Sequence, residues 1–202
     1  MAKIGLNNFR YAILTESADG TSTYDGAKSP GKAVSCNVEI SNNEAALYAD
    51  DVLVESDTSF QSGTVTIGID EEDLETMATL LGHEISVEGV LMRSSDDIAP
   101  YVGLGHVVTK MVNGEHKYKA EFLNKVKFSE PSAENNTKGE SVEFSTVEIE
   151  GTISALANGY WSEAKTFDTK EAAIEFLENL MKAPDGGGSD DDDDDNDNND
   201  TP

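Results

Sequence analysis

Apolar and polar side chains alternate through much of this 202-residue chain. In the longest such run, residues 118–128, the aromatic and aliphatic side chains would share one face, opposite Lys and Glu. Alternate residues of a β-strand lie on the same face of a sheet, so the pattern predicts strands that each bury one face. Three shorter sets indicate further strands: Val34, Cys36, Val38 and Ile40; Val65, Ile67 and Ile69; Ile85, Val87 and Leu91. The sequence therefore predicts a mainly β protein.

A last alternating run covers residues 142–153, but its phase changes at Ser145 and Thr146. One extra residue there would restore the register, so we predict a β-bulge.

Two segments have the spacing of helices instead. Across residues 74–81, apolar side chains fall at i, i+3, i+4 and i+7; Asp70 is expected to cap the helix and Gly82 to end it. A second helix is predicted from about Thr169 to Lys182, with Asp168 and Glu171 spaced as a cap and its partner. Each helix has one apolar stripe, which favours packing against a sheet.

The chain is strongly acidic, with a formal net charge of −26. Nine Asp and no Lys or Arg lie among the last 18 residues, which leaves −17 for the rest. This charge argues against electrostatic capture of nucleic acid or of anionic membranes. Residues 184–202 have almost nothing apolar to bury, and we expect a disordered tail there.

The residues that carry common site chemistry are sparse. Cys36 is the single cysteine, so no intrachain disulfide or cysteine cluster for zinc is possible. His83, His106 and His116 lie in different segments, without the spacing of metal ligands. We therefore expect neither a metal centre nor a cofactor.

Enzyme motifs are weak as well. Residues 48–51 superficially copy a polymerase signature, but the chain is too short and too acidic for a polymerase. The acid pairs Asp50–Asp51 and Asp96–Asp97 could suggest glycoside hydrolysis, yet an acidic composition supplies such pairs by chance. Gly103 and Gly105 lack the rest of a dinucleotide-binding motif and indicate close backbone packing or a bulge. We expect no enzymatic activity.

No secretory signal is visible at the start, and no apolar run approaches the ~20 residues of a membrane span. The sequence therefore predicts a protein of a reducing cytoplasm with no membrane span.

Four segments together resemble the major tail proteins of long-tailed phages that infect Gram-positive bacteria. They are residues 1–14 (MAKIGLNNFRYAIL), 47–51 (LYADD), 91–105 (LMRSSDDIAPYVGLG) and 128–153. The likeness extends to about residue 154. The motif residues that carry it are Tyr48, Asp50, Asp51, Ser95, Asp96, Asp97, Pro100 and Tyr101.

The resemblance implies a tail tube domain over residues 1–155, built as a two-sheet β sandwich or barrel with one flanking helix. Residues 156–183 would form an extension with the second helix, followed by the tail at 184–202. Such proteins close into rings, expected here to hold six copies, which stack into a tube. DNA passes through the tube to the host cell without specific binding. Tape-measure and tail terminator proteins would be further partners, and assembly in the host cytoplasm would lead to the virion tail.

The resemblance also suggests two groups of functional residues. We expect acidic side chains of the last strand to line the channel, namely Glu143, Glu148 and Glu150. The polar connection 129–140 is expected to contact neighbouring subunits or rings. Its candidate contact residues are Glu130, Pro131, Asn135, Asn136, Thr137, Lys138 and Gly139.

Two alternatives remain at this stage. A surface β-sandwich that binds carbohydrate or another protein also fits acidity and strands, although Trp161 and a few Tyr are the only side chains suited to stacking on sugar. A DNA-mimic inhibitor would fit the charge alone. Rings or tubes in electron micrographs would favour the tail protein.

Overall fold

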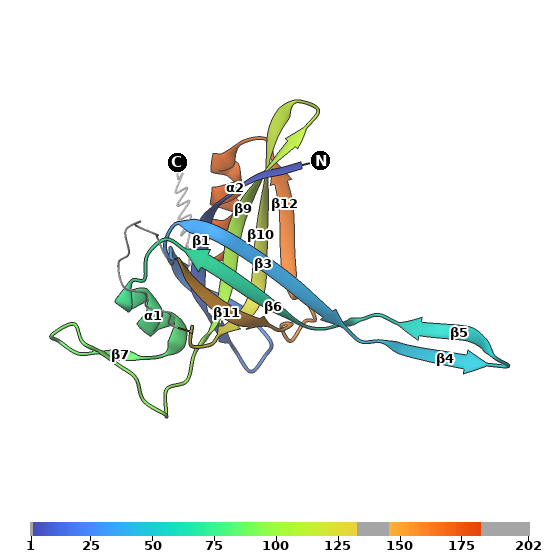
Figure 1. Ribbon diagram of the computed structural model, residues 1–202, viewed down its shortest axis with the longest axis horizontal. Helices are drawn as coiled ribbons and strands as arrows, with labels where there is room; N and C mark the ends of the chain where they lie inside the picture. Colours follow the sequence, from blue (N-terminus) through green and yellow to red (C-terminus); the bar gives the residue numbers. More distant parts are fainter. Residues whose placement is uncertain (1, 133–145, 183–202) are drawn as a thin grey trace, which may run out of the picture.

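The computed structural model describes residues 2–132 and 146–182, and these residues confirm a mainly β fold with two helices. Figure 1 shows a twisted β body from which a long hairpin projects. The predicted bulge cannot be followed, because Ser145 lies outside the described residues and only Thr146 lies inside them. The acidic tail at 184–202 lies wholly outside the described residues. The strands are β1 (Ala2–Glu16), β2 (Ser22–Lys28), β3 (Ala33–Asn42), β4 (Ala45–Ala49), β5 (Val52–Asp57), β6 (Phe60–Ile69), β7 (Glu84–Ile85), β8 (Leu91–Met92), β9 (Tyr101–Val112), β10 (Glu115–Phe128), β11 (Val147–Ile153) and β12 (Ser162–Phe167); the helices are α1 (Leu74–Leu81) and α2 (Lys170–Leu180).

The main sheet has eight antiparallel strands, in the order β2-β1-β9-β10-β11-β6-β3, with β12 also paired to β10. Strand β10 is the branching point. One of its edges pairs with β9, while the other pairs with β12 over residues 118–123 and with β11 over 126–128. A register shift between Leu123 and Val126 separates these two stretches. The sheet therefore divides at this irregularity, which adds local twist.

The two parts of the sheet enclose the larger core. Inward-facing side chains of β1, β6, β9, β10 and β11 meet there, and α1 closes one end with Met77, Leu80 and Leu81. At the open side β3 lies beside β1 without pairing with it. Because β3 is an edge strand here, Val34, Val38 and Ile40 each keep more than a third of their surface exposed. The apolar face predicted for residues 34–40 is therefore only partly covered.

Helix α1 follows the predicted range and ends at Gly82, whose φ of 77° is left-handed. Its cap differs from the prediction. Asp73 caps the helix by accepting a hydrogen bond from the Thr76 N–H at 2.9 Å. Asp70 instead accepts the Lys32 N–H at 2.8 Å, at the start of β3. Four acidic residues, 70–73, precede the helix, and either Asp70 or Asp73 could be a cap by sequence alone. The contact with Lys32 gives Asp70 the role of holding the start of β3.

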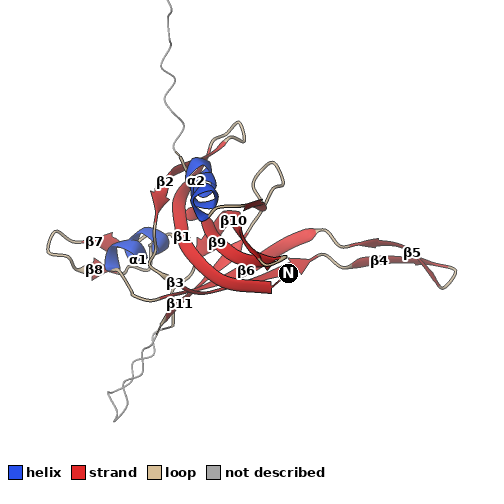
Figure 2. Ribbon diagram, turned by 90° about the horizontal axis from the view of Figure 1, so that it is seen from above, coloured by secondary structure: helices blue, strands red, loops and turns tan. Residues whose placement is uncertain are grey.

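Helix α2 packs on the opposite face of the sheet, over β1, β9 and β10 (Figure 2). Thr169, not Asp168, is its N-cap, since the Thr169 hydroxyl accepts from the Ala172 N–H. Asp168 instead pairs with Lys117 at 2.8 Å. The buried side chains at this contact are Ala12, Val107, Ala120, Phe122, Ala173, Leu177 and Met181.

The two glycines of β9 allow this close packing. A Cβ at Gly105 would lie 2.9 Å from Leu177 Cδ2, and one at Gly103 would lie 2.5 Å from Phe122. The expectation of close backbone packing at these glycines is confirmed.

Residues 84–92 depart from the prediction of a core strand. They form a short hairpin, β7–β8, whose turn contains Val87 and Gly89. Val87 is fully exposed, and Ile85 and Val90 also face solvent. Alternation in this segment therefore marks a protruding apolar hairpin.

Candidate assembly surfaces

Residues 43–59 form a projecting hairpin, here called the arm, which contains β4 and β5. The Asn43 N–H donates to the Ser59 carbonyl at 2.8 Å and closes its base. At the tip, Asp50 and Asp51 have φ values of 49° and 62° between paired Ala49 and Val52. Positive φ at both central residues is typical of a two-residue hairpin turn. The motif residues Asp50 and Asp51 thus build the tip of the arm.

The arm stands away from the body in both perpendicular views (Figures 1 and 2). Every residue from 43 to 59 is exposed. Its five large apolar side chains are each between 51% and 65% exposed: Leu47, Tyr48, Val52, Leu53 and Val54. Exposed apolar side chains gathered in one place are typical of a contact surface.

The arm is also strongly acidic. It contains five carboxylates and neither Lys nor Arg: Glu44, Asp50, Asp51, Glu55 and Asp57. A surface that binds the arm must therefore accept apolar side chains and compensate negative charge.

A second apolar protrusion lies at the opposite end of the long axis (Figure 1). It consists of the β7–β8 hairpin and the following loop, with Val87, Val90, Met92 and Ile98 exposed. The two protrusions differ in shape and sequence.

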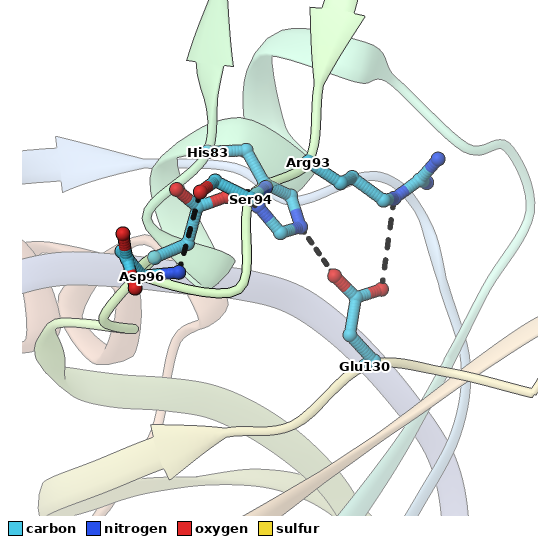
Figure 3. A network of polar contacts seen from close by, with 6 residues as sticks. His83, Arg93, Ser94, Asp96 and Glu130 are labelled. Carbon is cyan, nitrogen blue, oxygen red and sulfur yellow. Dashed lines mark hydrogen bonds and ion pairs between the residues drawn. The ribbon is translucent and has the colours of Figure 1, made fainter.

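His83 connects the loop after β8 to the end of β10 (Figure 3). Its Nδ1 lies 2.6 Å from Asp97 Oδ2, and its Nε2 contacts Glu130 Oε1. Arg93 Nε is 3.8 Å from the other oxygen of Glu130. Only 5% of the His83 side chain is exposed. Both ring nitrogens of His83 therefore face carboxylate oxygens, one from the loop after β8 and one from the end of β10.

The same network orients the acidic loop. The Ser94 N–H donates to Asp97 Oδ2 at 2.8 Å, and this bond, together with His83, lowers the pKa of Asp97. Of the other motif residues here, Ser95 and Asp96 are exposed and Pro100 is half-buried. Asp97 therefore has a structural role, whereas its neighbours face solvent.

Tyr101 lies apart from this network, against the lysines of β10. Lys125 Nζ is 4.5 Å and Lys127 Nζ 5.4 Å from the centre of its ring. These are cation–π distances, so the Pro-Tyr step positions an aromatic surface under two cations.

Glu148 and Glu150 are exposed on β11, on the face away from the core. Glu148 of β11 pairs with Gly68 of β6, which pairs in turn with Ser35 of β3. In the same way, Glu150 pairs with Thr66, which pairs with Asn37. The next row adds Thr152, Thr64 and Glu39. We call these nine positions the polar face; their ionisable members are all acidic. Glu143 lies outside the described residues.

The predicted inter-ring segment is described only at its start. Glu130 belongs to the His83 network, and Pro131 is half-buried. Asn135, Asn136, Thr137, Lys138 and Gly139 lie outside the described residues.

A cavity of about 500 Å³ lies at the open side between β1 and β3. Leu6, Cys36 and Trp161 line it together with His106 and Glu121. His106 Nε2 is 3.1 Å from Glu121 Oε2, and this bond, more than the contact with Lys119, lowers the pKa of Glu121 to about 2. Burial raises the pKa of Cys36 to about 11, so its thiol stays protonated at neutral pH.

Three lysines form a row on the same side of the sheet as this cavity. Lys3 of β1 lies directly opposite Lys110 of β9, which lies opposite Lys117 of β10. Directly opposed residues share a face of the sheet. We call Lys3, Lys110 and Lys117 the lysine row. Like charges so placed repel one another. A group of three cations is also unexpected in a chain with only 14 Lys and Arg against 40 Asp and Glu.

Sequence reasoning missed both the cavity and the lysine row. One signal could have indicated part of the row: Asn113-Gly114 is typical of a two-residue hairpin turn, and such a turn places Lys110 opposite Lys117. The pairing of Lys3 with this hairpin has no comparable local signal.

Comparison of the chain with models of known protein families and with curated protein sequences finds no match. Within residues 2–132 and 146–182, no helix is long and apolar enough to cross a membrane. The same residues contain no group of three His, Cys, Asp or Glu side chains arranged to hold a metal ion.

Proposed function

We propose that this chain is a structural protein of a phage tail, whose copies assemble through the arm into stacked rings that form the tail tube. Six copies per ring, a channel for DNA and contacts with tape-measure and terminator proteins belong to this proposal. The resemblance in residues 1–154 motivates it. The structure supports it through features that suit a subunit of an assembly.

The arm is the observation that carries the proposal. Five large apolar side chains protrude on a hairpin whose residues are all exposed. A two-stranded hairpin is at best marginally stable alone in water, and its apolar side chains gain stability only when another surface covers them. An element of this kind suits contact with a neighbouring subunit.

The positions of the protrusions favour a head-to-tail arrangement. The arm and the β7–β8 hairpin lie at opposite ends of the molecule and have different shapes (Figure 1). Contacts between unlike surfaces produce rings when the rotation closes and filaments when it does not. A tube of stacked rings combines the two: contacts within a ring close, and contacts between rings continue along the tube.

The polar face is a candidate for the wall of the channel. Its ionisable residues, Glu39, Glu148 and Glu150, are acidic and exposed. DNA binding requires cations that replace the counterions of the phosphates, so an acidic wall would let DNA slide past. We propose that this face lines the tube.

The carbohydrate-binding alternative has less support. Trp161, the side chain best suited to stacking on sugar, stacks on Phe60 with ring centres 4.8 Å apart and planes 4° apart. One face of the indole is therefore already covered.

Sedimentation velocity over a range of protein concentrations, with electron microscopy of the same samples, tests the proposal. The parent protein should form rings or hollow tubes as concentration rises. Replacing Tyr48 and Leu53 with Ser should stop assembly and leave the fold intact, because both side chains are exposed on the arm.

The matched control replaces the same residue types elsewhere on the exposed surface, as Tyr160→Ser with Leu74→Ser. This control should assemble like the parent. A parent protein that stays monomeric at every concentration, or that binds glycans as a monomer, would refute the proposal.

A further inference from the structure

We propose that the arm of one copy docks on the lysine row of a second copy, with an apolar arm side chain entering the adjacent cavity. This inference rests on the proposed function and names the acceptor for the arm. It follows from the charges and apolar surfaces of the two partners.

Two of the three lysines in the row have no ion-pair partner among the described residues. Lys117 is paired with Asp168 at 2.8 Å and Glu115 at 3.3 Å. Lys3 and Lys110 form no ion pair with any residue in the described ranges 2–132 and 146–182. The repulsion inside the row would be relieved by an acidic partner laid across it.

The cavity beside the row offers a partly apolar pocket, in which Glu121 is already bonded to His106 and Lys119. Lys3 itself lines the cavity of about 500 Å³, next to Leu6, Val34 and Val38. Half of Val34 and over a third of Val38 are exposed, because the edge strand β3 does not pair with β1 there. A central apolar pocket with charges at its margin is the usual arrangement of a strong protein contact.

The arm matches this surface in both respects. It carries five carboxylates without a cation, and it presents Tyr48 and Leu53 as side chains able to enter a pocket. Complementary charges at the margin of such a contact speed association and fix its orientation.

The other apolar protrusion suits the arm less well. The β7–β8 hairpin and its loop carry four carboxylates, against the single cation Arg93: Glu84, Glu88, Asp96 and Asp97. Arg93 is already near Glu130. An acidic arm would be repelled at that end, so electrostatics favour the lysine row.

DNA is the other polyanion that lysines could attract. Capture of DNA needs several cations that replace counterions, whereas the row has only two without an ion-pair partner among described residues, on a chain with a net charge of −26. The apolar side chains that line the cavity beside the row, such as Leu6, Val34 and Val38, also have no use in a contact with phosphates. The arm is therefore the better occupant.

Charge reversal tests the docking. Lys3→Glu with Lys110→Glu should raise the concentration needed for assembly by about tenfold or more, as measured by sedimentation velocity. The control, Lys28→Glu with Lys182→Glu, makes the same charge change at exposed lysines away from the row and should assemble like the parent. Circular dichroism of each variant checks that the fold is retained.

Rescue gives the sharper readout. Adding Glu44→Lys and Glu55→Lys to the Lys3→Glu, Lys110→Glu protein should restore part of the assembly, because two new lysines on the arm would then face the two new glutamates of the row, while Asp50, Asp51 and Asp57 stay on the arm. Equal loss of assembly in the control pair, or no rescue by the arm reversal, would overturn the docking. So would binding of a fluorescent DNA duplex that the row variant abolishes.

These outcomes separate the two proposals. If the parent protein never assembles, the proposed function fails. If the parent assembles and the row variant assembles equally well, the proposed function stands and only the docking on the lysine row is wrong.

Discussion

His83 Nδ1 lies 2.6 Å from Asp97 Oδ2, and the opposite nitrogen of the same buried ring contacts Glu130. One side chain thereby joins the end of α1, the acidic loop and the end of β10. A Gln at position 83 could donate through only one nitrogen and could not reach both carboxylates. We predict that His83→Gln lowers the free energy of unfolding by about 1–3 kcal/mol, measured by urea denaturation at pH 7.

His116 provides the control, because it is exposed near the β9–β10 turn. His116→Gln should leave the unfolding curve unchanged. If the two variants unfold at the same urea concentration, the contacts of His83 contribute no stability.

Glu121 should make stability depend on pH in the acid range. Its pKa in the folded protein is lowered to about 2 from 4.5, mainly by the bond from His106. A carboxylate with a lowered pKa stabilises the fold fully above its unfolded pKa and loses this effect as pH falls toward the folded pKa. We predict that Glu121→Gln costs about 1–3 kcal/mol at pH 7.

The difference between parent and Glu121→Gln should shrink progressively between pH 5 and pH 2, as followed by urea unfolding. Glu163→Gln, on the exposed side of β12, serves as the comparison and should show no such trend. A Glu121→Gln deficit that is constant across this range would show that the carboxylate charge is not responsible.

Asp73 should matter to α1 as an acceptor and not as a charge alone. Its side chain accepts from both the N–H and the hydroxyl of Thr76. We predict that Asp73→Ala lowers stability by about 1 kcal/mol, whereas Asp73→Asn retains most of it. Thermal unfolding measures both, with Glu72→Ala as the control. Equal losses for Ala and Asn would contradict the capping role.

Leu177 should anchor α2 to the sheet. It is fully buried, and its methyl groups lie over Gly105 of β9. We predict that Leu177→Ala costs about 2–5 kcal/mol in chemical denaturation, since it leaves a cavity at the helix–sheet contact. Leu180→Ala, at a half-buried position of the same helix, should cost clearly less. Similar costs at both positions would mean that the helix end is not held by Leu177.

Local patterns predicted most elements because their signals lie within a few residues. The i, i+3, i+4 spacing and Gly82 located α1, and alternation over residues 118–128 located β10. The caps were predicted less well. Asp70 and Asp168 have the chemistry of caps, but the first bonds the backbone of Lys32 and the second pairs with Lys117. Both partners are distant in sequence, so local spacing could not identify them.

Apolar alternation by itself determined that this chain would be built of strands with one face to bury. Only the tertiary structure decided which of those faces are covered: Ile67 is enclosed, whereas Leu53 on the arm and Val87 on the β7–β8 hairpin face solvent. The lysine row shows the same limit, because it exists only where three strands align. Periodicity records that a side chain is apolar or charged. Which side chains become neighbours is decided by the pairing of strands that lie up to about a hundred residues apart, as Lys3 and Lys110 do, and a local sequence pattern carries no information about that pairing.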